Sequence, residues 1–201
     1  MRVGSSAMLR TEKWNMARAM RTSTRASAIA TVVLLVIMLT ACGREISGQQ
    51  ARDNEMGLLM LADADRQPVP AITGEALEGG PIGIADFGGK VVVLNAFASW
   101  CTPCQQELPV LAAAEKQYPN VQFLGLDVQD NDEAALGFLA AEGATYPVIK
   151  DPAGDLLAKF TINPAKGLPV TFLIDEQGRV AGRILGKVTT ESLAAAIKSL
   201  T

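Results

Sequence analysis

Apolar and polar positions alternate along the second half of the chain in a way that predicts a mixed α/β fold. Short apolar runs bounded by turn residues predict strands at 91–97, 121–128, 146–149, 170–174 and 179–185. Apolar residues at helical spacing predict helices over 103–117, 132–142, 155–160 and 190–200. Strands that first alternate with helices and then pair as a hairpin indicate a mixed central sheet with helices on both faces.

A second, smaller hairpin is predicted ahead of this pattern. Residues 71–77 and 81–84 flank Glu78-Gly79-Gly80, and a glycine-containing turn between two short runs is typical of a β-hairpin. The composition becomes that of a globular domain near Pro68. We therefore expect residues 67–201 to form one domain, long enough to bury a single core, with this hairpin as its N-terminal extension.

The N-terminal region has the layout of an export signal. An apolar stretch at 26–41 follows a segment that carries all six basic residues of this region, namely Arg2, Arg10, Lys13, Arg18, Arg21 and Arg25. The stretch ends in Leu39-Thr40-Ala41-Cys42, which resembles the lipobox of bacterial lipoproteins. This resemblance implies cleavage before Cys42 and a lipid on its sulfur.

Three segments follow from that interpretation. We expect a lipoprotein signal peptide at 1–41, a lipidated cysteine with a flexible tether at 42–66, and the folded domain beyond. An uncleaved single-span anchor is the open alternative, because the apolar stretch is close to the length that crosses a bilayer. Both interpretations place the domain outside the cytoplasm and hold it at the cell membrane.

Charge then argues against two classes of partner. The chain has 18 basic and 21 acidic residues. Without residues 1–41, which hold six of the basic residues and Glu12, 12 basic and 20 acidic residues remain, a net charge of about −8. An acidic domain is unsuited to nucleic acid or to an anionic lipid surface. We expect no nucleic-acid partner, and contact with the membrane only through the anchor.

The candidate chemistry lies in the motif Trp100-Cys101-Thr102-Pro103-Cys104, which separates the apolar run 91–97 from the helical stretch that follows. A thiolate at a helix N-terminus is stabilised by unpaired backbone N–H groups and by the helix dipole. Cys101 is therefore expected to be the nucleophile. Cys104 lies one turn further along and can attack a mixed disulfide. Pro103 suits the first helical turn, where no N–H partner is lost.

Composition excludes most other uses of such a pair. A structural zinc site needs about four ligands, whereas the chain has three cysteines and no histidine. Haem attachment would require a histidine directly after the second cysteine, and that residue is Gln105. A static structural disulfide is the remaining alternative, although so small a ring contributes little loop entropy. We expect a redox-active Cys101–Cys104 disulfide, no metal and no separate cofactor.

Residues 89–104, which end in the CxxC motif, and residues 167–175, which contain Leu168-Pro169, resemble the membrane-anchored, thioredoxin-like thiol–disulfide oxidoreductases of the TlpA/ResA type. The resemblance covers roughly residues 68–200. It implies a thioredoxin-like fold, a cis-proline at Pro169 that faces the cysteines, and an insertion at 143–163 before the cis-proline strand. It also implies that Cys101 attacks and that Cys104 resolves.

The resemblance implies roles for the neighbouring residues as well. Glu107 would shift the pKa values of the two cysteines and accept the proton of the resolving thiol. The ordinary interpretation of such a residue is a solvated glutamate on the helix face. Leu168 would offer its backbone to an extended partner segment. Trp100 would cover the disulfide from the surface, and Thr102 and Pro103 would influence the reduction potential. Plain thioredoxins bury an aspartate where this chain has Asn95, and asparagine cannot act as a base.

The expected function is reduction or exchange of disulfides in exported proteins. Its partners would be protein thiols and disulfides, together with a membrane protein that supplies or removes electrons. Three uses remain open: reduction of apocytochrome c before haem attachment, reduction of copper-site cysteines, and a DsbE/DsbF-like oxidation of secreted proteins. A peroxiredoxin-type peroxidase is disfavoured because no arginine lies near Cys101 in sequence, and a copper carrier is disfavoured because the chain has no histidine.

Overall fold

A sheet of seven strands organises the part of the chain that the computed structural model describes, residues 57–161 and 167–201. Its strands are β1 (Leu58–Met60), β2 (Gln67–Pro68), β5 (Val92–Phe97), β6 (Gln122–Val128), β7 (Val148–Asp151), β8 (Val170–Ile174) and β9 (Arg179–Leu185). Their order is β1-β9-β8-β5-β6-β7, and β2 also pairs with β9. β5, β6 and β7 are parallel, whereas β8, β9 and β1 are antiparallel to their neighbours. The prediction of a mixed sheet is confirmed.

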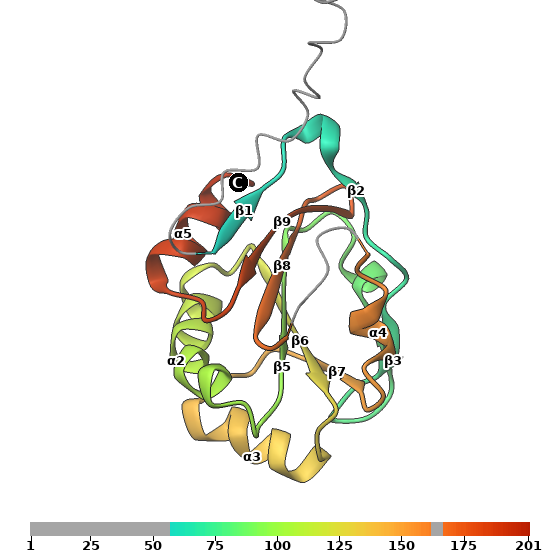
Figure 1. Cartoon of the computed structure of the whole chain (residues 1–201), viewed down its shortest axis with the longest axis vertical. Coiled ribbons are helices and arrows are strands. Elements are labelled where there is room, and N and C mark those ends of the chain that lie inside the picture. Colours follow the sequence, from blue (N-terminus) through green and yellow to red (C-terminus); the bar gives the residue numbers. More distant parts are fainter. Residues whose placement is uncertain (1–56, 162–166) are drawn as a thin grey trace, which may run out of the picture. The chain divides into compact units, whose positions relative to one another are not determined.

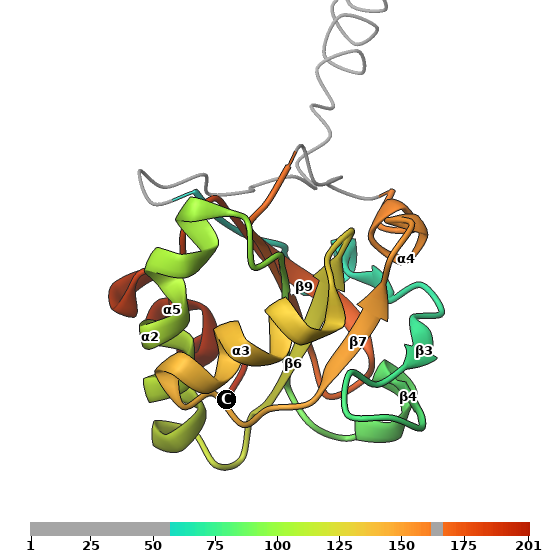
Figure 2. The same cartoon turned by 90° about the horizontal axis from the view of Figure 1, so that it is seen from below.

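Three helices cover one face of this sheet. They are α2 (Thr102–Gln117), α3 (Asp132–Glu142) and α5 (Thr190–Lys198), and Figure 2 shows them together on one side of the strands. Side chains alternate along β5, so Val93 and Phe97 pack into the core beneath these helices, with Leu108 of α2 and Leu193 of α5. The cysteines of the CxxC motif belong to the same core.

The opposite face has a lighter cover. It consists of the hairpin β3 (Thr73–Glu75) and β4 (Pro81–Gly83), the 3₁₀ turn η2 (Ile84–Phe87) and the short helix α4 (Asp155–Ala158). Val92, Leu94 and Ala96 of β5 face this layer and pack in a second core with Ile72 and Phe172. Helices therefore lie on both faces, and the predicted hairpin is present (Figure 1).

Local sequence accounts for the ends of the helices. Asn131 caps α3, where its side chain accepts hydrogen bonds from the N–H groups of Glu133 and Ala134. Gly143 ends α3 at a φ of 65°, in the left-handed region that glycine adopts without strain. Thr189 caps α5. The ends of α3 and the start of α5 are thus set by residues adjacent to them in the sequence.

The folded region begins earlier than expected, which corrects the end of the proposed tether. Residues 57–66 contain β1 and the 3₁₀ turn η1 (Asp63–Asp65), whereas a flexible segment was expected up to residue 66. β1 pairs antiparallel with β9, and Leu58, Leu59 and Leu61 are buried. Burial of this leucine patch favours a strand over a solvated tether. Residues 58–60 thus form a strand and not a helix.

The segment predicted to be an insertion contains regular secondary structure. The expected insertion at 143–163 contains β7, which extends the sheet beside β6, and α4. β7 begins two residues later than predicted, after Pro147. The expected signal peptide, the expected lipidation site Cys42 and the expected tether up to residue 56 lie outside the described residues. Within the described residues, no helix has the length and apolar character that crossing a membrane requires.

Candidate active site

The two cysteines lie at the start of α2, shortly after the end of β5. β5 ends at Phe97, and Cys101 occupies the N-cap position of α2 in an extended conformation. Its sulfur forms a disulfide with Cys104 and accepts a hydrogen bond from the Cys104 N–H at 3.3 Å. One free N–H of the first helical turn thus points at the sulfur of Cys101, in the direction that stabilises a thiolate.

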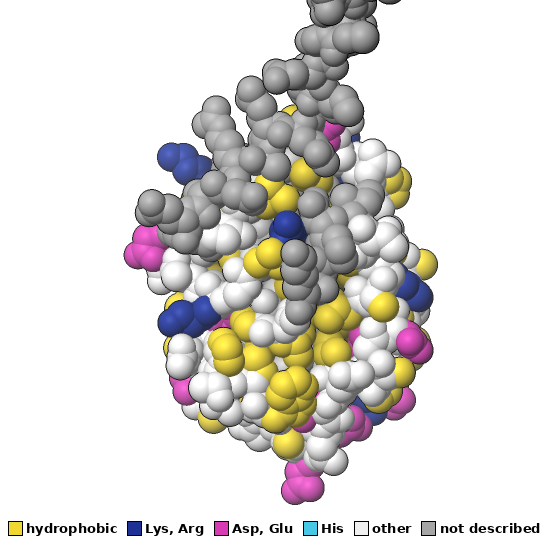
Figure 3. All heavy atoms as spheres, in the orientation of Figure 1, with side chains coloured by type: hydrophobic (Ala, Val, Ile, Leu, Met, Phe, Trp, Pro, Cys, Tyr) yellow, Lys and Arg dark blue, Asp and Glu magenta, His cyan; other side chains and the backbone are white. Residues whose placement is uncertain are grey.

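The pair is buried, with a small opening on the side of Cys101. Cys101 is 5% exposed and Cys104 is 1% exposed, whereas Thr102 and Pro103 between them are exposed. Trp100 is 60% exposed and is one of two large hydrophobic side chains that the described residues leave open to solvent. Figure 3 shows hydrophobic side chains gathered in the lower centre of the face where β5 ends and α2 begins.

A loop after β6 fixes the segment that precedes Cys101. Asp130 accepts hydrogen bonds from the backbone N–H of Ser99 and from its hydroxyl, the latter at 2.9 Å. The indole N–H of Trp100 donates to the carbonyl oxygen of Gln129 at 3.1 Å. The indole is therefore oriented by a hydrogen bond to the backbone, although most of its surface is left exposed by the described residues.

Pro169 lies at the same edge of the sheet as the cysteines. The peptide bond between Leu168 and Pro169 is cis. β5 and β8 are antiparallel with Ala96 opposite Val170, which brings Pro169 level with the end of β5. Leu168 is partly buried and packs against both cores. The structure thus brings the two distinctive sequence segments together across one strand pair.

Glu107 is wholly buried, which rules out the solvated interpretation. It is 0% exposed and lies one helical turn beyond Cys104 on α2. Its Oε1 accepts from Asn95 Nδ2 at 2.8 Å, and its Oε2 accepts from the backbone N–H of Val188 at 2.7 Å. The Asn95 amide also donates to the hydroxyl oxygen of Thr171 at 3.0 Å.

Burial dominates the acidity of this carboxyl group. Loss of solvent raises the pKa of Glu107 to about 7, although the hydrogen bonds from Val188 and Asn95 and the charge of Lys187 oppose the rise. A group whose pKa lies near neutrality can take up and release a proton under the conditions in which a thiol reacts. Glu107 is thus equipped to exchange protons, whereas Asn95 is not.

Two acidic residues, Asp127 and Asp130, lie next to the segment that precedes Cys101. Asp127 of β6 is 3% exposed, and one of its oxygens has no partner among the described residues. Burial, the negative charge of Asp130 and a hydrogen bond to it raise the pKa of Asp127 to about 7. Partial burial acts to raise the pKa of Asp130, but the hydrogen bonds that it accepts from Ser99 and Asn131 outweigh burial, so its pKa is lowered. Of the two carboxyl groups, Asp127 is thus the one that takes up a proton first as the pH falls.

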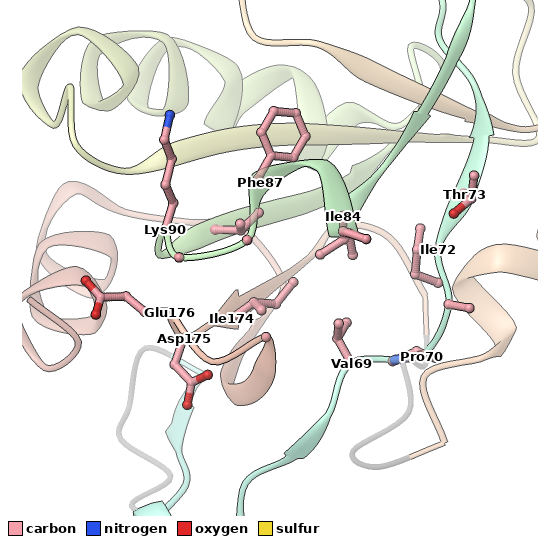
Figure 4. Close-up of a pocket in the computed structure, with 16 residues that line it drawn as sticks. Val69, Pro70, Ile72, Thr73, Ile84, Phe87, Lys90, Ile174, Asp175 and Glu176 are labelled. Atoms are coloured by element: carbon pink, nitrogen blue, oxygen red, sulfur yellow. The ribbon is translucent and has the colours of Figure 1, made fainter.

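A separate pocket of about 300 Å³ lies between η2, the segment before β3 and the end of β8 (Figure 4). Val69, Ile72, Ile84 and Phe87 give it a mainly apolar lining, with Lys90 at the rim. None of the residues discussed around the disulfide lines it. Across the described ranges, no group of three or more His, Cys, Asp or Glu side chains is placed to hold a metal ion.

Sequence reasoning missed the residues that support the site from neighbouring strands. Thr171, Asp127 and Asp130 were not singled out, and Asn95 was noted only as a substitution. Thr171 and Asp127 each interrupt an apolar run in a buried strand, and a polar residue there must find a partner inside the protein. That signal marks them as buried polar residues, but their partners come from distant parts of the chain.

A dithiol that closes into a disulfide at the start of a helix is suited to exchange with other thiols and disulfides. On a sheet of this topology, with a cis-proline level with the cysteines, it defines the class of thioredoxin-like thiol–disulfide oxidoreductases. Comparison with known proteins agrees with this class. The model of the AhpC/TSA family matches residues 65–183.

Named relatives narrow the assignment. The thiol–disulfide oxidoreductase ResA of Bacillus thuringiensis subsp. konkukian is 30% identical over 173 residues, which cover 85% of this chain and 94% of ResA. A DsbF homologue from Corynebacterium diphtheriae superposes with a TM-score of 0.67 at 33% identity, over 73% of this chain and 95% of its own. A secreted thiol–disulfide isomerase from Corynebacterium glutamicum superposes with a TM-score of 0.67 at 32% identity, over 74% of this chain and 93% of its own.

The chain therefore belongs to the AhpC/TSA family and to its ResA-type thiol–disulfide oxidoreductases. It is an enzyme that exchanges thiols and disulfides, as the sequence predicts.

Proposed function

We propose that Cys101 is the attacking thiol and Cys104 the resolving thiol of an enzyme that reduces or exchanges disulfides in exported proteins. The observation that carries this order is the position of Cys101 at the N-cap of α2, with a backbone N–H directed at its sulfur. Cys101 is also the more exposed of the two. Cys104 is shielded from an incoming partner but remains within reach of a mixed disulfide on Cys101.

In the reductive direction, two electrons pass from the two cysteines to a disulfide of the partner. The Cys101 thiolate attacks a partner disulfide, which forms a mixed disulfide and releases one partner thiolate. Glu107 takes the proton of the Cys104 thiol, and the resulting thiolate attacks Cys101. The Cys101–Cys104 bond forms while the second partner sulfur leaves as a thiolate and gains a proton from water. The partner gains two electrons, and the enzyme becomes the disulfide described above.

The surroundings of the cysteines are proposed to hold the partner chain. Leu168 lies in the segment just before β8, at the end of the strand pair where the cysteines lie, and its backbone would pair there with an extended segment of the partner. The exposed indole of Trp100 would pack on that segment. Thr102 and Pro103, both exposed, would contact the partner and influence the reduction potential.

We further propose that the enzyme works outside the cytoplasm, tethered through a lipid on Cys42. Support comes from the sequence of residues 1–42 and from a structural relative described as secreted. A single-span anchor at 26–41 is the alternative. The proposed substrates are apocytochrome c or copper-site cysteines, reduced with electrons from a membrane protein, and similarity to ResA favours this reductive role.

Oxidation of secreted proteins is the second candidate function, because one relative is a DsbF homologue at 33% identity. The equilibrium reduction potential of Cys101–Cys104 in the full-length protein, measured against glutathione and dithiothreitol, separates the two roles. A value near or below about −250 mV supports a reductase, and a value above about −150 mV supports an oxidant. Consumption of hydrogen peroxide faster than reduction of a CxxCH peptide disulfide would overturn both in favour of a peroxidase.

A further inference from the structure

The buried carboxyl group of Glu107 is held by donors on both of its oxygens. Oε2 receives the backbone N–H of Val188, and Oε1 receives Nδ2 of Asn95. Both bonds suit a negatively charged carboxylate, which is an acceptor only. The side chain is 0% exposed, so water does not offer these oxygens an alternative partner.

A proton on this carboxyl group therefore changes what its partners must do. The Val188 N–H is a backbone donor and cannot become an acceptor, so Oε2 has to stay free to accept. A carbonyl oxygen accepts more strongly than a hydroxyl oxygen, so the proton is best placed on Oε1, opposite the hydrogens of Asn95 Nδ2 at 2.8 Å. The hydrogen bond from Asn95 is then weakened, and the new O–H needs an acceptor inside the protein, which is costly if none is present.

An asparagine side chain can remove this conflict without moving away. Its amide carries an acceptor oxygen and a donor nitrogen of nearly the same shape, so a half-turn exchanges them. Nδ2 of Asn95 now donates to both Glu107 and Thr171. After the half-turn, Oδ1 would stand in its place and accept from the Glu107 O–H and from the Thr171 hydroxyl. The hydroxyl group can serve as acceptor or donor, so both hydrogen bonds survive in reverse.

We propose that the Asn95 amide turns over each time Glu107 gains or loses its proton, and that Thr171 reverses its hydrogen bond at the same time. Asn95 and Thr171 are thus positioning residues that keep Glu107 fully paired in both protonation states. This inference rests on the proposed function of Glu107 as proton acceptor for Cys104. It would let a buried acid change its charge during turnover while its own two oxygens stay paired with Val188 and Asn95.

Other titratable groups near Glu107 do not supply the missing acceptor. Lys187, beside Val188, is a cation and donates to Gln106 at 3.3 Å. Burial and the negative charge of Glu107 raise the pKa of the Tyr146 hydroxyl, but this hydroxyl has no hydrogen-bond partner among the described residues. The two cysteines are joined in the disulfide and carry no proton. Asn95 hydrogen-bonds to Oε1, so it is the residue that must change from donor to acceptor when Oε1 is protonated.

The test is an NMR titration of the oxidised full-length protein in detergent, with labelled asparagine and glutamate side chains. Above the titration of the Glu107 carboxyl carbon, the Asn95 amide protons should show a strong nuclear Overhauser effect to the Thr171 methyl group. Below it, that effect should fall several-fold, with the same midpoint. Loss of the carboxyl proton with an unchanged Asn95 pattern would overturn the proposal.

Two variants sharpen this result. In Glu107→Gln the Val188 N–H still requires the Gln oxygen, so the new amide nitrogen faces Asn95 at every pH. Asn95 should then show its low-pH pattern even at pH 9, and persistence of the high-pH pattern there would contradict the proposal. These readouts use no substrate, so they can fail while disulfide exchange by the wild type succeeds, and the reverse also holds.

Thr171→Val retains the shape of the side chain but removes its hydroxyl. The second N–H of Asn95 then lacks an acceptor when Glu107 is ionised, whereas in the acid form Oδ1 still accepts from Glu107. We expect the Glu107 titration to move upward by at least about half a pH unit. Thr73→Val, at an exposed strand position, is the matched control and should leave the midpoint unchanged. Equal midpoints in both variants would overturn the role of Thr171.

Discussion

Replacement of Glu107 by glutamine should change how the stability of the oxidised protein depends on pH. Burial raises the pKa of this carboxyl group from 4.5 to about 7. A shift of one unit corresponds to about 1.4 kcal/mol, so the difference between the folded and unfolded chains amounts to about 3 kcal/mol. Glu107 is 0% exposed, so solvent does not screen this effect away.

The sign follows from the direction of the shift. The folded chain binds the Glu107 proton more tightly than the unfolded chain does. The wild type therefore loses stability as the pH rises from about 4.5 to about 7, whereas a glutamine does not titrate. The difference in unfolding free energy between Glu107→Gln and wild type should shift by about 3 kcal/mol in favour of the variant between pH 4.5 and pH 8.

Urea unfolding at half-unit pH steps, with the disulfide intact, measures this difference. The comparison cancels the contributions of other titrating groups, Asp127 included. Glu142→Gln, at an exposed position of α3, is the matched control and should show a nearly constant difference. A Glu107→Gln difference that stays constant with pH, or moves in favour of the wild type, would refute the burial argument.

Three further outcomes follow from the sequence and structure. Cys42→Ala should move the protein from the membrane to the soluble fraction on cell fractionation, and retention in the membrane would instead support a single-span anchor. Asp127→Asn should be more stable relative to wild type at pH 8 than at pH 5 in thermal melts, because burial raises the pKa of Asp127 to about 7; an equal difference at both values would contradict the assignment. Asn131→Ala should lose about 1 kcal/mol in urea unfolding, because the cap accepts two N–H groups of α3, and an unchanged midpoint would disprove that contribution.

Local signals were sufficient for most of the fold. The strands β5, β6, β8 and β9 and the helix α3 begin and end within a residue or so of their expected positions, because apolar runs, caps and turn glycines act over short distances. β1 was missed because a three-residue strand depends on its partner. Its leucines are buried only when it pairs with β9, which lies more than 120 positions away.

The candidate site divides in the same way. Cys101 and Cys104 follow from a motif in one short segment, as does the position of Glu107 one turn later. The burial of Glu107 does not, because it depends on Val188 and Asn95 from other elements. Whether a helix glutamate is solvated or buried is a tertiary property. The packing of α2 against β5 and against the segment before α5 decides it.

The order in which the two cysteines act can be measured directly. The direct measurement is intact mass spectrometry of full-length Cys104→Ser and Cys101→Ser variants, each with Cys42→Ala to remove the third thiol, mixed with a peptide disulfide. If Cys101 attacks first, Cys104→Ser should accumulate a mixed disulfide on Cys101 at least about ten times faster than Cys101→Ser does on Cys104. Faster capture by Cys101→Ser would contradict it.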